Sequence, residues 1–426
     1  MLHIDSSLVD RARQDFADRN PESRRAYDHA RRHLPGGHTR TVLTHRPFPL
    51  TFVAGHGATM TDADGHEYID MLGDYSAGLL GHSETRVLDA VTVALRTNVS
   101  VGGIHPAETV LADLMCERFG LDRVRFTNSG TEANLMAITT AIQATGKAKV
   151  MVFAGGYHGG VLYFASGIAP WNAPYDFVVA PYNDLTATAA LIDEHAHGLA
   201  AVLIEPMQGS AGCIPAEPEF LRGTFAAARA AGAVCIADEV MTSRHGRHGL
   251  VDLFGARADI TTFGKYIGGG FSFGAFGGTA NLLDLYDTSP EGGRTSFIAH
   301  AGTFNNNIAT MTAGGVVLGK VYTADVAEAH TARGAELRGQ VAAVLARHDL
   351  PLTVTGYGSM MNLHAEPSLL ELVYLGLLER GVYLAARGMI NLGLAHTDDQ
   401  LAAVLDRLDD CVGAVAERVR TATTVR

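Results

Sequence analysis

From about residue 84 to residue 320, short apolar runs alternate with longer segments in which apolar positions recur at helical spacing. Apolar or otherwise strand-like runs predict strands at Arg123–Thr127, Lys149–Phe153, Leu199–Ile204, Ala233–Ala237, Ile260–Phe263 and Phe273–Phe276. Between them, Gly130–Thr145 and Pro218–Ala231 are predicted to be helices. Apolar strands alternating with amphipathic helices are typical of a mainly parallel sheet that is covered on both faces. This part of the chain is therefore predicted to be an α/β domain.

The two ends of the chain have different patterns. Residues 5–33 are predicted to be helical, and residues 49–72 read as strands joined by a tight turn at Asp62–Gly65. A calcium loop is the alternative for this turn, but its glycine is misplaced and Gly73 stands where a carboxylate is required. Beyond about 321 the chain is helix-rich, with strand-like pieces near 352–363 and 389–394. We predict a large domain over 73–320, a small α+β domain over 321–426, and an N-terminal segment, 1–72, that packs with the small domain.

Composition narrows the function classes. The 426 residues include 33 basic and 45 acidic side chains, and a net charge of −12 argues against a nucleic-acid binder or a polybasic membrane-surface protein. Met1–Asn20 is charged and lacks the apolar core of a signal peptide, and no apolar run approaches the length of a membrane span, so a cytoplasmic protein is expected. The four cysteines form no C-x-x-C pair, which predicts buried, reduced thiols and no structural metal site.

Polar residues follow several of the predicted strands, where α/β sheets bind ligands. The run Asn128–Glu132 opens a helix whose free amides suit a phosphate, although an ordinary helix cap is the alternative. In Gly155–Gly159, glycines flank Tyr157, which could lie over a flat ligand or simply occupy a surface turn. Glu205 and Gln208 follow another strand and either point into the same cleft or stabilise a turn.

Two charged residues stand in strongly apolar surroundings. Asp238 ends a fully apolar predicted strand, where a carboxylate is costly unless it is paired or functional. Lys265 lies in an almost uncharged stretch from Ile260 to Thr279. It is expected to have a lowered pKa or a covalent role, the alternative being a side chain that extends to the surface.

Together these residues fit pyridoxal 5′-phosphate (PLP). The phosphate suits the helix N-terminus, the flat ring an aromatic side chain, the ring nitrogen a carboxylate, and the aldehyde a lysine. A nucleotide-dependent enzyme of Rossmann type is a distant alternative, because neither a Walker A motif nor G-x-G-x-x-G is present.

Over essentially its whole length the chain resembles the class III aminotransferases of PLP fold type I. The resemblance is carried by PGGHTR, DADGHEYID, FTNSGTEAN, GGYHG, EPMQG, ADEVMTSR, GKYIGGG and HAGTFNNN. Within that family it is similar to the aromatic β-amino acid (β-phenylalanine) aminotransferases and, next, to glutamate-1-semialdehyde aminomutase. The resemblance implies a large α/β domain with a mostly parallel sheet and a smaller α+β domain.

The resemblance also implies residue roles. Lys265 would form the Schiff base with the cofactor and then carry a proton, while Asp238 would pair with the ring nitrogen. Further residues expected at the cofactor are Ser129, Gly130 and Thr131 at the phosphate, and Tyr157, His158, Glu205, Gln208, Val240 and Met241 around the ring or beside the substrate. Thr303 is expected to reach the phosphate of a neighbouring subunit, so the active unit would be a homodimer.

Two arginines are expected to bind substrate, since a guanidinium fork suits a carboxylate. Arg40 follows the Pro35–Gly37 turn, where the β-amino acid enzymes and the aminomutase have a carboxylate-binding arginine. Arg387 matches the arginine with which transaminases bind a 2-oxo acid. For both, the alternative is a surface salt bridge.

The resemblance therefore implies a ping-pong transamination from an aromatic β-amino acid to 2-oxoglutarate or pyruvate. An aminomutase, which needs no acceptor, is the nearest alternative. A non-catalytic PLP-binding protein is a more distant one, because such a protein has no chemical need for both Lys265 and Asp238.

Overall fold

The computed structural model describes residues 4–289, 292 and 297–424. The chain divides into two compact units. The terminal unit comprises residues 1–84 and 333–426, and the central unit comprises residues 85–332. Both boundaries lie 12 residues after the predicted ones at 72 and 320, and the second falls inside one long helix, α11 (Ala324–Leu345). An apolar pattern that continues through a helix carries no mark of a domain boundary, which explains the difference.

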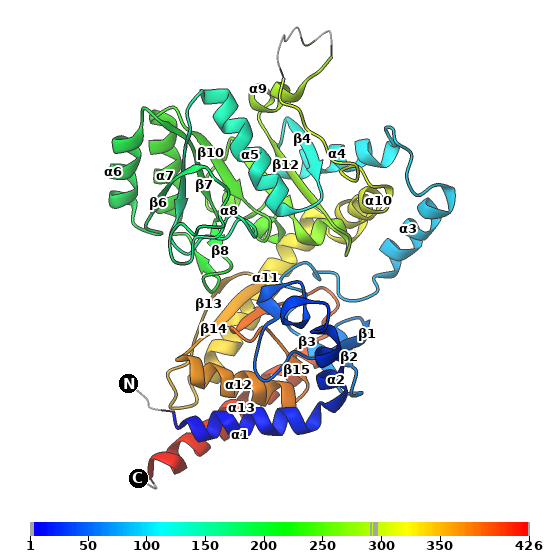
Figure 1. The fold of residues 1–426 in the computed structure, drawn as a ribbon, viewed down its shortest axis with the longest axis vertical. Helices are drawn as coiled ribbons and strands as arrows, with labels where there is room; N and C mark the ends of the chain where they lie inside the picture. Colours follow the sequence, from blue (N-terminus) through cyan, green and yellow to red (C-terminus); the bar gives the residue numbers. More distant parts are fainter. Residues whose placement is uncertain (1–3, 290–291, 293–296, 425–426) are drawn as a thin grey trace. The chain divides into compact units, whose positions relative to one another are not determined.

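The central unit contains a sheet with helices around it (Figure 1). Its strands are β4 (Arg123–Thr127), β5 (Lys149–Phe153), β6 (Asp176–Ala180), β7 (Leu199–Ile204), β10 (Val234–Asp238), β11 (Ile260–Gly264) and β12 (Gly274–Gly278), with the separate hairpin β8 (Met207–Gln208) and β9 (Ile214–Pro215). Its helices are α3 (Thr85–Thr97), α4 (Pro106–Phe119), α5 (Gly130–Thr145), α6 (Leu185–His195), α7 (Pro218–Ala230), α8 (Leu250–Leu253), α9 (Ala280–Leu283), α10 (Ile308–Val316) and the first part of α11.

The sheet order is β4-β12-β11-β10-β7-β5-β6. Strand β12 is antiparallel to both of its neighbours, β4 and β11, whereas the other pairs are parallel. Strand β4 therefore runs in the same direction as β11, β10, β7, β5 and β6. The carboxyl ends of these six strands consequently meet at one edge of the sheet, which is where ligands bind in such folds.

Both faces of the sheet are covered. Ala137 and Ile138 of α5 pack in one buried cluster with alternate strand residues such as Val234 and Ile236 of β10. Cys235, which lies between those two and so points to the opposite face, contacts the Phe225 carbonyl of α7 through its thiol at 3.5 Å. The predicted mostly parallel, doubly covered sheet is therefore confirmed. The sequence pattern did not identify β6 or the antiparallel direction of β12.

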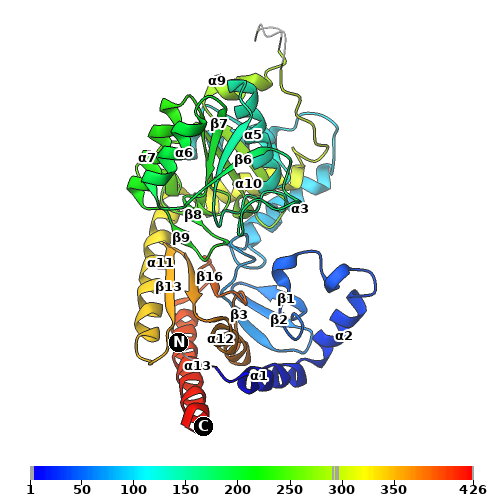
Figure 2. The same cartoon turned by 60° about the vertical axis from the view of Figure 1, so that its left-hand side comes forward.

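The terminal unit has two smaller sheets, ordered β1-β2-β3-β15 and β13-β14-β16 (Figure 2). Their strands are β1 (Phe52–His56), β2 (Thr59–Asp62), β3 (Glu67–Asp70), β13 (Thr353–Tyr357), β14 (Met360–His364), β15 (Val382–Tyr383) and β16 (Met389–Asn391). Its helices are α1 (Ser6–Arg19), α2 (Pro21–Ala30), α12 (Pro367–Glu379), α13 (Asp398–Thr424) and the rest of α11. Because β15 pairs with β3, residues from both ends of the chain share one sheet.

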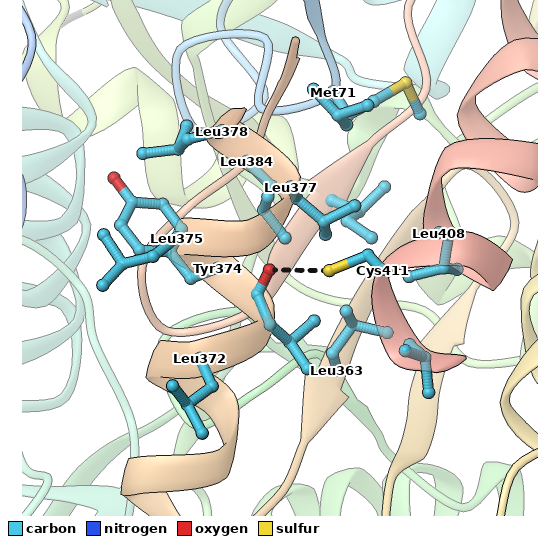
Figure 3. Close-up of a cluster of buried hydrophobic side chains, with 14 of the residues drawn as sticks. Met71, Leu363, Leu372, Tyr374, Leu375, Leu377, Leu378, Leu384, Leu408 and Cys411 are labelled. Atoms are coloured by element: carbon cyan, nitrogen blue, oxygen red, sulfur yellow. Dashed lines mark hydrogen bonds between the residues drawn. The ribbon is translucent and has the colours of Figure 1, made fainter. Parts of the chain in front are cut away.

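The core of the terminal unit is built from both chain segments (Figure 3). Met71 of the N-terminal segment packs in the same buried cluster as Leu377 of α12 and Leu408 of α13. The Cys411 thiol contacts the Val373 carbonyl at 3.6 Å, so it is used as a small buried side chain.

The cysteines in the described residues are free thiols: Cys213, Cys235 and Cys411 are buried, whereas Cys116, predicted to be buried, is only half-buried. None of the helices described here is both long and apolar enough to span a bilayer.

Candidate active site

The N-terminus of α5 lies at the carboxyl edge of the central sheet. Ser129 is its N-cap, and the Ser129 hydroxyl accepts a hydrogen bond from the Glu132 amide at 3.2 Å. The Glu132 carboxylate in turn accepts one from the Asn128 amide at 2.8 Å. The amides at Gly130 and Thr131 belong to the first turn, which has no acceptors within its own helix. The ordinary cap is therefore observed, and it leaves the Gly130 and Thr131 amides for the predicted anion site, since the partial positive charge of a helix N-terminus suits a phosphate.

Asp238 is buried at the end of β10 and its carboxylate is held by three donors. Asp238 Oδ2 accepts a hydrogen bond from Asn134 Nδ2 at 2.8 Å and lies 2.8 Å from His158 Nδ1. Asp238 Oδ1 accepts one from the Val240 amide at 3.0 Å. An ionised carboxylate can accept about four hydrogen bonds, so roughly one position remains for a further donor. The cost of burying this charge is thus offset by hydrogen bonds.

Asn134 is itself fixed on a second side. Its Oδ1 accepts a hydrogen bond from the Thr262 hydroxyl at 2.8 Å, and its Nδ2 also donates to the His158 carbonyl at 3.0 Å. These contacts allow only one orientation of the amide, with the NH₂ group toward Asp238. Asn134 lies on α5 and Thr262 on β11, so the network connects the helix that begins at Gly130 to the strand that ends beside Lys265.

Glu205 follows β7 and connects two loops. Its two carboxylate oxygens accept hydrogen bonds from the Tyr157 amide at 2.9 Å and the Gly209 amide at 3.1 Å. Burial raises the pKa of Glu205 above its usual value, and the nearby His158 opposes this shift. Tyr157 is thereby held through its backbone, while its side chain is 42% exposed and packs edge-on against Tyr163. The Tyr157 ring is therefore accessible at this edge of the sheet.

Lys265 lies directly after β11 in a left-handed conformation, with φ of 53°. The preceding Gly264 is tightly packed, since an added Cβ would lie 3.0 Å from Val240 Cγ1 and 3.6 Å from the Gly130 nitrogen. A Cβ on Gly130 would in turn lie 2.7 Å from Val240 Cγ2. Close backbone packing, possible only with glycine, therefore brings Lys265, Val240 and the start of α5 together.

The remaining predicted residues of the central unit lie around these. Gln208 Nε2 donates to the Ala154 carbonyl at 2.8 Å and so supports the loop that carries Tyr157. Met241 packs on Gly209, where an added Cβ would lie 2.5 Å from its sulfur. Thr131 packs against the same glycine-rich loop, because a Cβ on Gly159 would overlap its hydroxyl.

Thr303 lies in an exposed loop of the central unit. Two residues further on, Asn305 Oδ1 accepts a hydrogen bond from Asn128 Nδ2 at 2.8 Å, so this loop is attached beside the start of α5 in its own chain. Whether Thr303 serves a neighbouring subunit stays a prediction.

The arrangement fits PLP. Asp238 has three of its acceptor positions occupied and about one left, the start of α5 provides an anion site, and glycines let Val240 and Lys265 approach the same point. The residues that would hold the cofactor are all in the central unit.

The two predicted substrate arginines lie in the terminal unit. Arg40 follows the Pro35–Gly37 turn, and its Nη1 lies 2.5 Å from Asp74 Oδ1. Arg387 lies in the turn between β15 and β16, and its carbonyl accepts a hydrogen bond from Asn362 Nδ2 at 3.1 Å. The structure brings both guanidinium groups to Tyr75: the Cζ atoms of Arg40 and Arg387 lie 5.5 Å and 5.6 Å from the centre of its ring.

Sequence reasoning missed three of these residues. Asn134 and Thr262 occupy positions inside a predicted helix and strand, and Tyr75 stands in an unremarkable segment. A buried asparagine on an otherwise apolar helix face is the one signal that could have pointed to Asn134, because a buried amide needs partners.

Comparison with known proteins decides the family. Residues 42–412 match the family described as aminotransferase class III. The chain is 44% identical over 426 residues to the β-phenylalanine transaminase of Variovorax paradoxus, with 96% of each chain covered.

The chain belongs to the class III aminotransferase family.

A solved structure of a β-phenylalanine aminotransferase from Variovorax paradoxus superposes on this aminotransferase with a TM-score of 0.93 at 43% identity, covering 96% of this chain and 97% of that one. A glutamate-1-semialdehyde 2,1-aminomutase of Dichelobacter nodosus is 38% identical over 309 residues, which cover 68% of this chain and 71% of that protein. The predicted family, and its relation to the aminomutases, are thus confirmed.

Proposed function

We propose that this aminotransferase moves the amino group of an aromatic β-amino acid to a 2-oxo acid such as 2-oxoglutarate or pyruvate, in a ping-pong reaction. The observation that carries the proposal is the placement of Arg40 and Arg387 at one tyrosine ring. Both substrates of such a reaction carry a carboxylate, whereas an aminomutase takes in no second substrate. The similarity to a β-phenylalanine transaminase supports the aromatic β-amino donor.

The cofactor is pyridoxal 5′-phosphate. When bound, it supplies an aldehyde that combines with the substrate amine and a ring that withdraws electrons from the carbon bearing that amine. Ser129, Gly130 and Thr131 bind the phosphate through the start of α5. Val240 and Tyr157 pack on the ring, with His158, Gln208 and Met241 around it.

The acid–base work falls to two side chains of the central unit. Asp238, whose carboxylate is oriented by three donors, would accept a hydrogen bond from the ring nitrogen and so keep that nitrogen protonated. Lys265 would hold the cofactor through its Nζ. The same Nζ, once free, would serve as the base that takes the proton from the carbon bearing the substrate amine.

Glu205 positions the ring-packing loop through the Tyr157 amide. Arg40 binds the carboxylate of the β-amino acid, and Arg387 that of the 2-oxo acid, by bidentate hydrogen bonds. Accordingly we propose the central unit as the cofactor domain and the terminal unit as the small domain.

We also propose that the active unit is a homodimer in which Thr303 reaches the partner's phosphate. Ile104 and Phe304, 89% and 60% exposed, lie on loops joined by Asn306, whose Nδ2 donates to the Gly103 carbonyl at 3.2 Å. Exposed apolar side chains that adjoin in this way favour burial against a second copy. Sedimentation of the holoenzyme should give a dimer, and Ile104→Asp should shift it toward monomer with loss of activity.

The amino donor is tested by adding racemic β-phenylalanine to purified holoenzyme without an acceptor. The absorbance of the aldehyde form of the cofactor should disappear, and 2-oxoglutarate should restore it. If β-amino acids leave the absorbance unchanged and glutamate-1-semialdehyde is isomerised without acceptor, the aminomutase alternative replaces the proposal.

The covalent role is tested with Lys265→Ala. This variant should lose turnover by at least about 10⁴-fold, because it lacks both the attachment point and the proton carrier. PLP should then be removable by gel filtration without any reducing or nucleophilic reagent. Substantial activity in this variant would refute the assignment, and an inactive wild type that binds PLP would favour the non-catalytic alternative.

A further inference from the structure

Arg40, Tyr75 and Arg387 are far apart in the sequence and meet in the terminal unit. The distances of 5.5 Å and 5.6 Å from the ring centre to the two guanidinium carbons place those carbons within about 11 Å of each other. Two cations repel each other, so placing both guanidinium groups here requires an attractive interaction that offsets the repulsion. The electron-rich face of an aromatic ring attracts a guanidinium, and here one ring does so for both.

Tyr75 is held firmly enough to act as a fixed support. Its side chain is buried, and its hydroxyl donates to the Val42 carbonyl at 3.0 Å. The residues from Gly73 to Ser76 all have positive φ, between 43° and 76°. Such a conformation is costly for residues with side chains and persists only where the surrounding structure imposes it. Burial raises the pKa of Tyr75, so the phenol stays neutral and keeps its hydrogen bond.

The backbone around this left-handed segment supplies those restraints. The Gly78 amide donates to the Gly73 carbonyl at 2.8 Å, and the Asp70 carboxylate accepts from the Leu72 and Gly73 amides at 2.9 Å and 3.0 Å. Asn391, the last residue of β16 in the terminal unit, donates to the Leu72 carbonyl at 2.8 Å. An unusual backbone that is restrained on several sides orients particular side chains, and the two that it presents here are Asp74 and Tyr75.

Asp74 balances half of the positive charge. It pairs with Arg40 through one nitrogen only, and the side chains of Asp74 and Arg40 are 57% and 47% exposed. The other donors of the Arg40 fork are therefore not used by this pair, and a guanidinium has five. The charges of Arg40, Arg387 and Asp74 sum to one positive charge beside an aromatic ring, which suits a carboxylate whose substituent is aromatic.

We propose that Tyr75 is a positioning residue that holds Arg40 and Arg387 together as one carboxylate-binding cluster, in which Arg40 serves the donor and Arg387 the acceptor. This rests on the proposed function, in which both arginines bind substrate carboxylates. A ping-pong enzyme admits its two substrates one after the other, and the carboxylate is the group they share. Because one ring holds both guanidinium groups, a change to that ring is expected to alter carboxylate binding in both half-reactions.

The test compares Tyr75→Leu, which removes the ring, with Tyr75→Phe, which keeps it. Each half-reaction of the holoenzyme is followed by stopped-flow absorbance, with β-phenylalanine as donor and 2-oxoglutarate as acceptor. Tyr75→Leu should raise the half-saturation concentration about 5- to 30-fold for both substrates with nearly unchanged limiting rates, since uniform binding is lost. Tyr75→Phe should stay within about threefold of the wild type.

Hydroxylamine is the control ligand, because it reacts with the cofactor and has no carboxylate. Its rate should be the same in the wild type and both variants, which separates carboxylate binding from damage to the cofactor site. If Tyr75→Leu does not fold, Tyr75→Met provides a side chain of intermediate size that also lacks a ring. Thermal unfolding of each holoenzyme shows which variant is suitable.

Arg40→Ala and Arg387→Ala show whether a failure concerns the role of Tyr75 or the proposed function on which that role rests. If these variants raise the half-saturation concentrations but the ring-lacking variant does not, the role of Tyr75 is wrong while the proposed function stands. An effect of Tyr75→Leu on only one substrate would likewise overturn the shared cluster. If neither arginine variant affects either substrate, the proposed carboxylate binding itself is wrong.

Discussion

The two groups of site residues handle charge in opposite ways. In the central unit, the Asp238 carboxylate is buried and receives three short hydrogen bonds from Asn134, His158 and the Val240 amide. In the terminal unit, the Arg40–Asp74 pair is about half exposed and makes one contact, with the Tyr75 ring beside it. Buried hydrogen bonds to a charge fix its orientation and are costly to break, whereas exposed pairs contribute little to stability.

The difference corresponds to what we propose that each group binds. A resident cofactor benefits from groups that are oriented before it binds. In the central unit, hydrogen bonds between the polar side chains provide this orientation. Substrates enter and leave in every cycle, and an exposed guanidinium with unused donors can exchange one carboxylate for another at small cost. The comparison predicts that substitutions in the central unit reduce rates strongly, and that those in the terminal unit change substrate affinity.

Apart from Lys265→Ala, the largest effect is expected for Asp238→Asn. The variant should fold, but its kcat should fall by about 10²–10⁴-fold, because the charge that keeps the ring nitrogen protonated is lost. If the new amide keeps its oxygen toward Asn134 and His158, its NH₂ group would face the Val240 amide, which is also a donor. Steady-state kinetics together with thermal unfolding measure this, and a kcat equal to that of the wild type would remove Asp238 from the mechanism.

Asn134→Leu is expected to have the next largest effect. It removes a hydrogen bond to a charged group, a loss of about 1.5–3 kcal/mol, or roughly 10- to 100-fold in kcat. Thr262→Val is the matched milder change, because it removes only the hydroxyl that fixes the Asn134 amide. A ranking in which Thr262→Val is the more damaging would show that Asn134 is not the link to Asp238.

A buried carboxylate should also make stability depend on pH. Burial raises the pKa of Glu239 from 4.5 to about 8, and its carboxylate accepts hydrogen bonds from the Leu250 and Val251 amides. Between these two pH values the folded state keeps a proton that the unfolded state has lost, so stability falls as pH rises. Glu239→Gln lacks this titration. Its Tm relative to the wild type should therefore increase from pH 5 to pH 8, measured by calorimetry, and a constant difference would contradict the assignment.

The smallest effect is expected for Asp74→Asn. The free energy of unfolding should change by less than about 1 kcal/mol, because the pair with Arg40 is exposed. The KM for carboxylate substrates should nevertheless fall about two- to fivefold, since a negative charge beside Arg40 has been removed. A large loss of stability without a change in KM would contradict the view that charged residues of the terminal unit affect substrate affinity more than stability.

Much of the central unit could be predicted from the sequence. The limits of β5 and β7 match the predicted runs, because a strand buried on both faces must be apolar along most of its length. The limits of β4 also match, although this strand has two arginines and an exposed first residue. β12 (Gly274–Gly278) was harder, since its glycine-rich run gives no indication of direction, and only its pairing with β4 and β11 shows that it is antiparallel.

In the candidate site, too, some residues could be predicted from the sequence and others could not. Lys265, Asp238 and the start of α5 could be predicted because each is a local departure from its surroundings at the end of a strand. The sequence alone determined the α/β class, the strand-end residues and, through its motifs, the class III aminotransferase family. Only the tertiary structure showed that Asn134 joins Asp238 to Thr262, and that Arg40 and Arg387 share the ring of Tyr75. Apolar periodicity and strand ends are local properties of the chain, whereas hydrogen bonds and ring contacts between distant segments depend on how the whole chain packs.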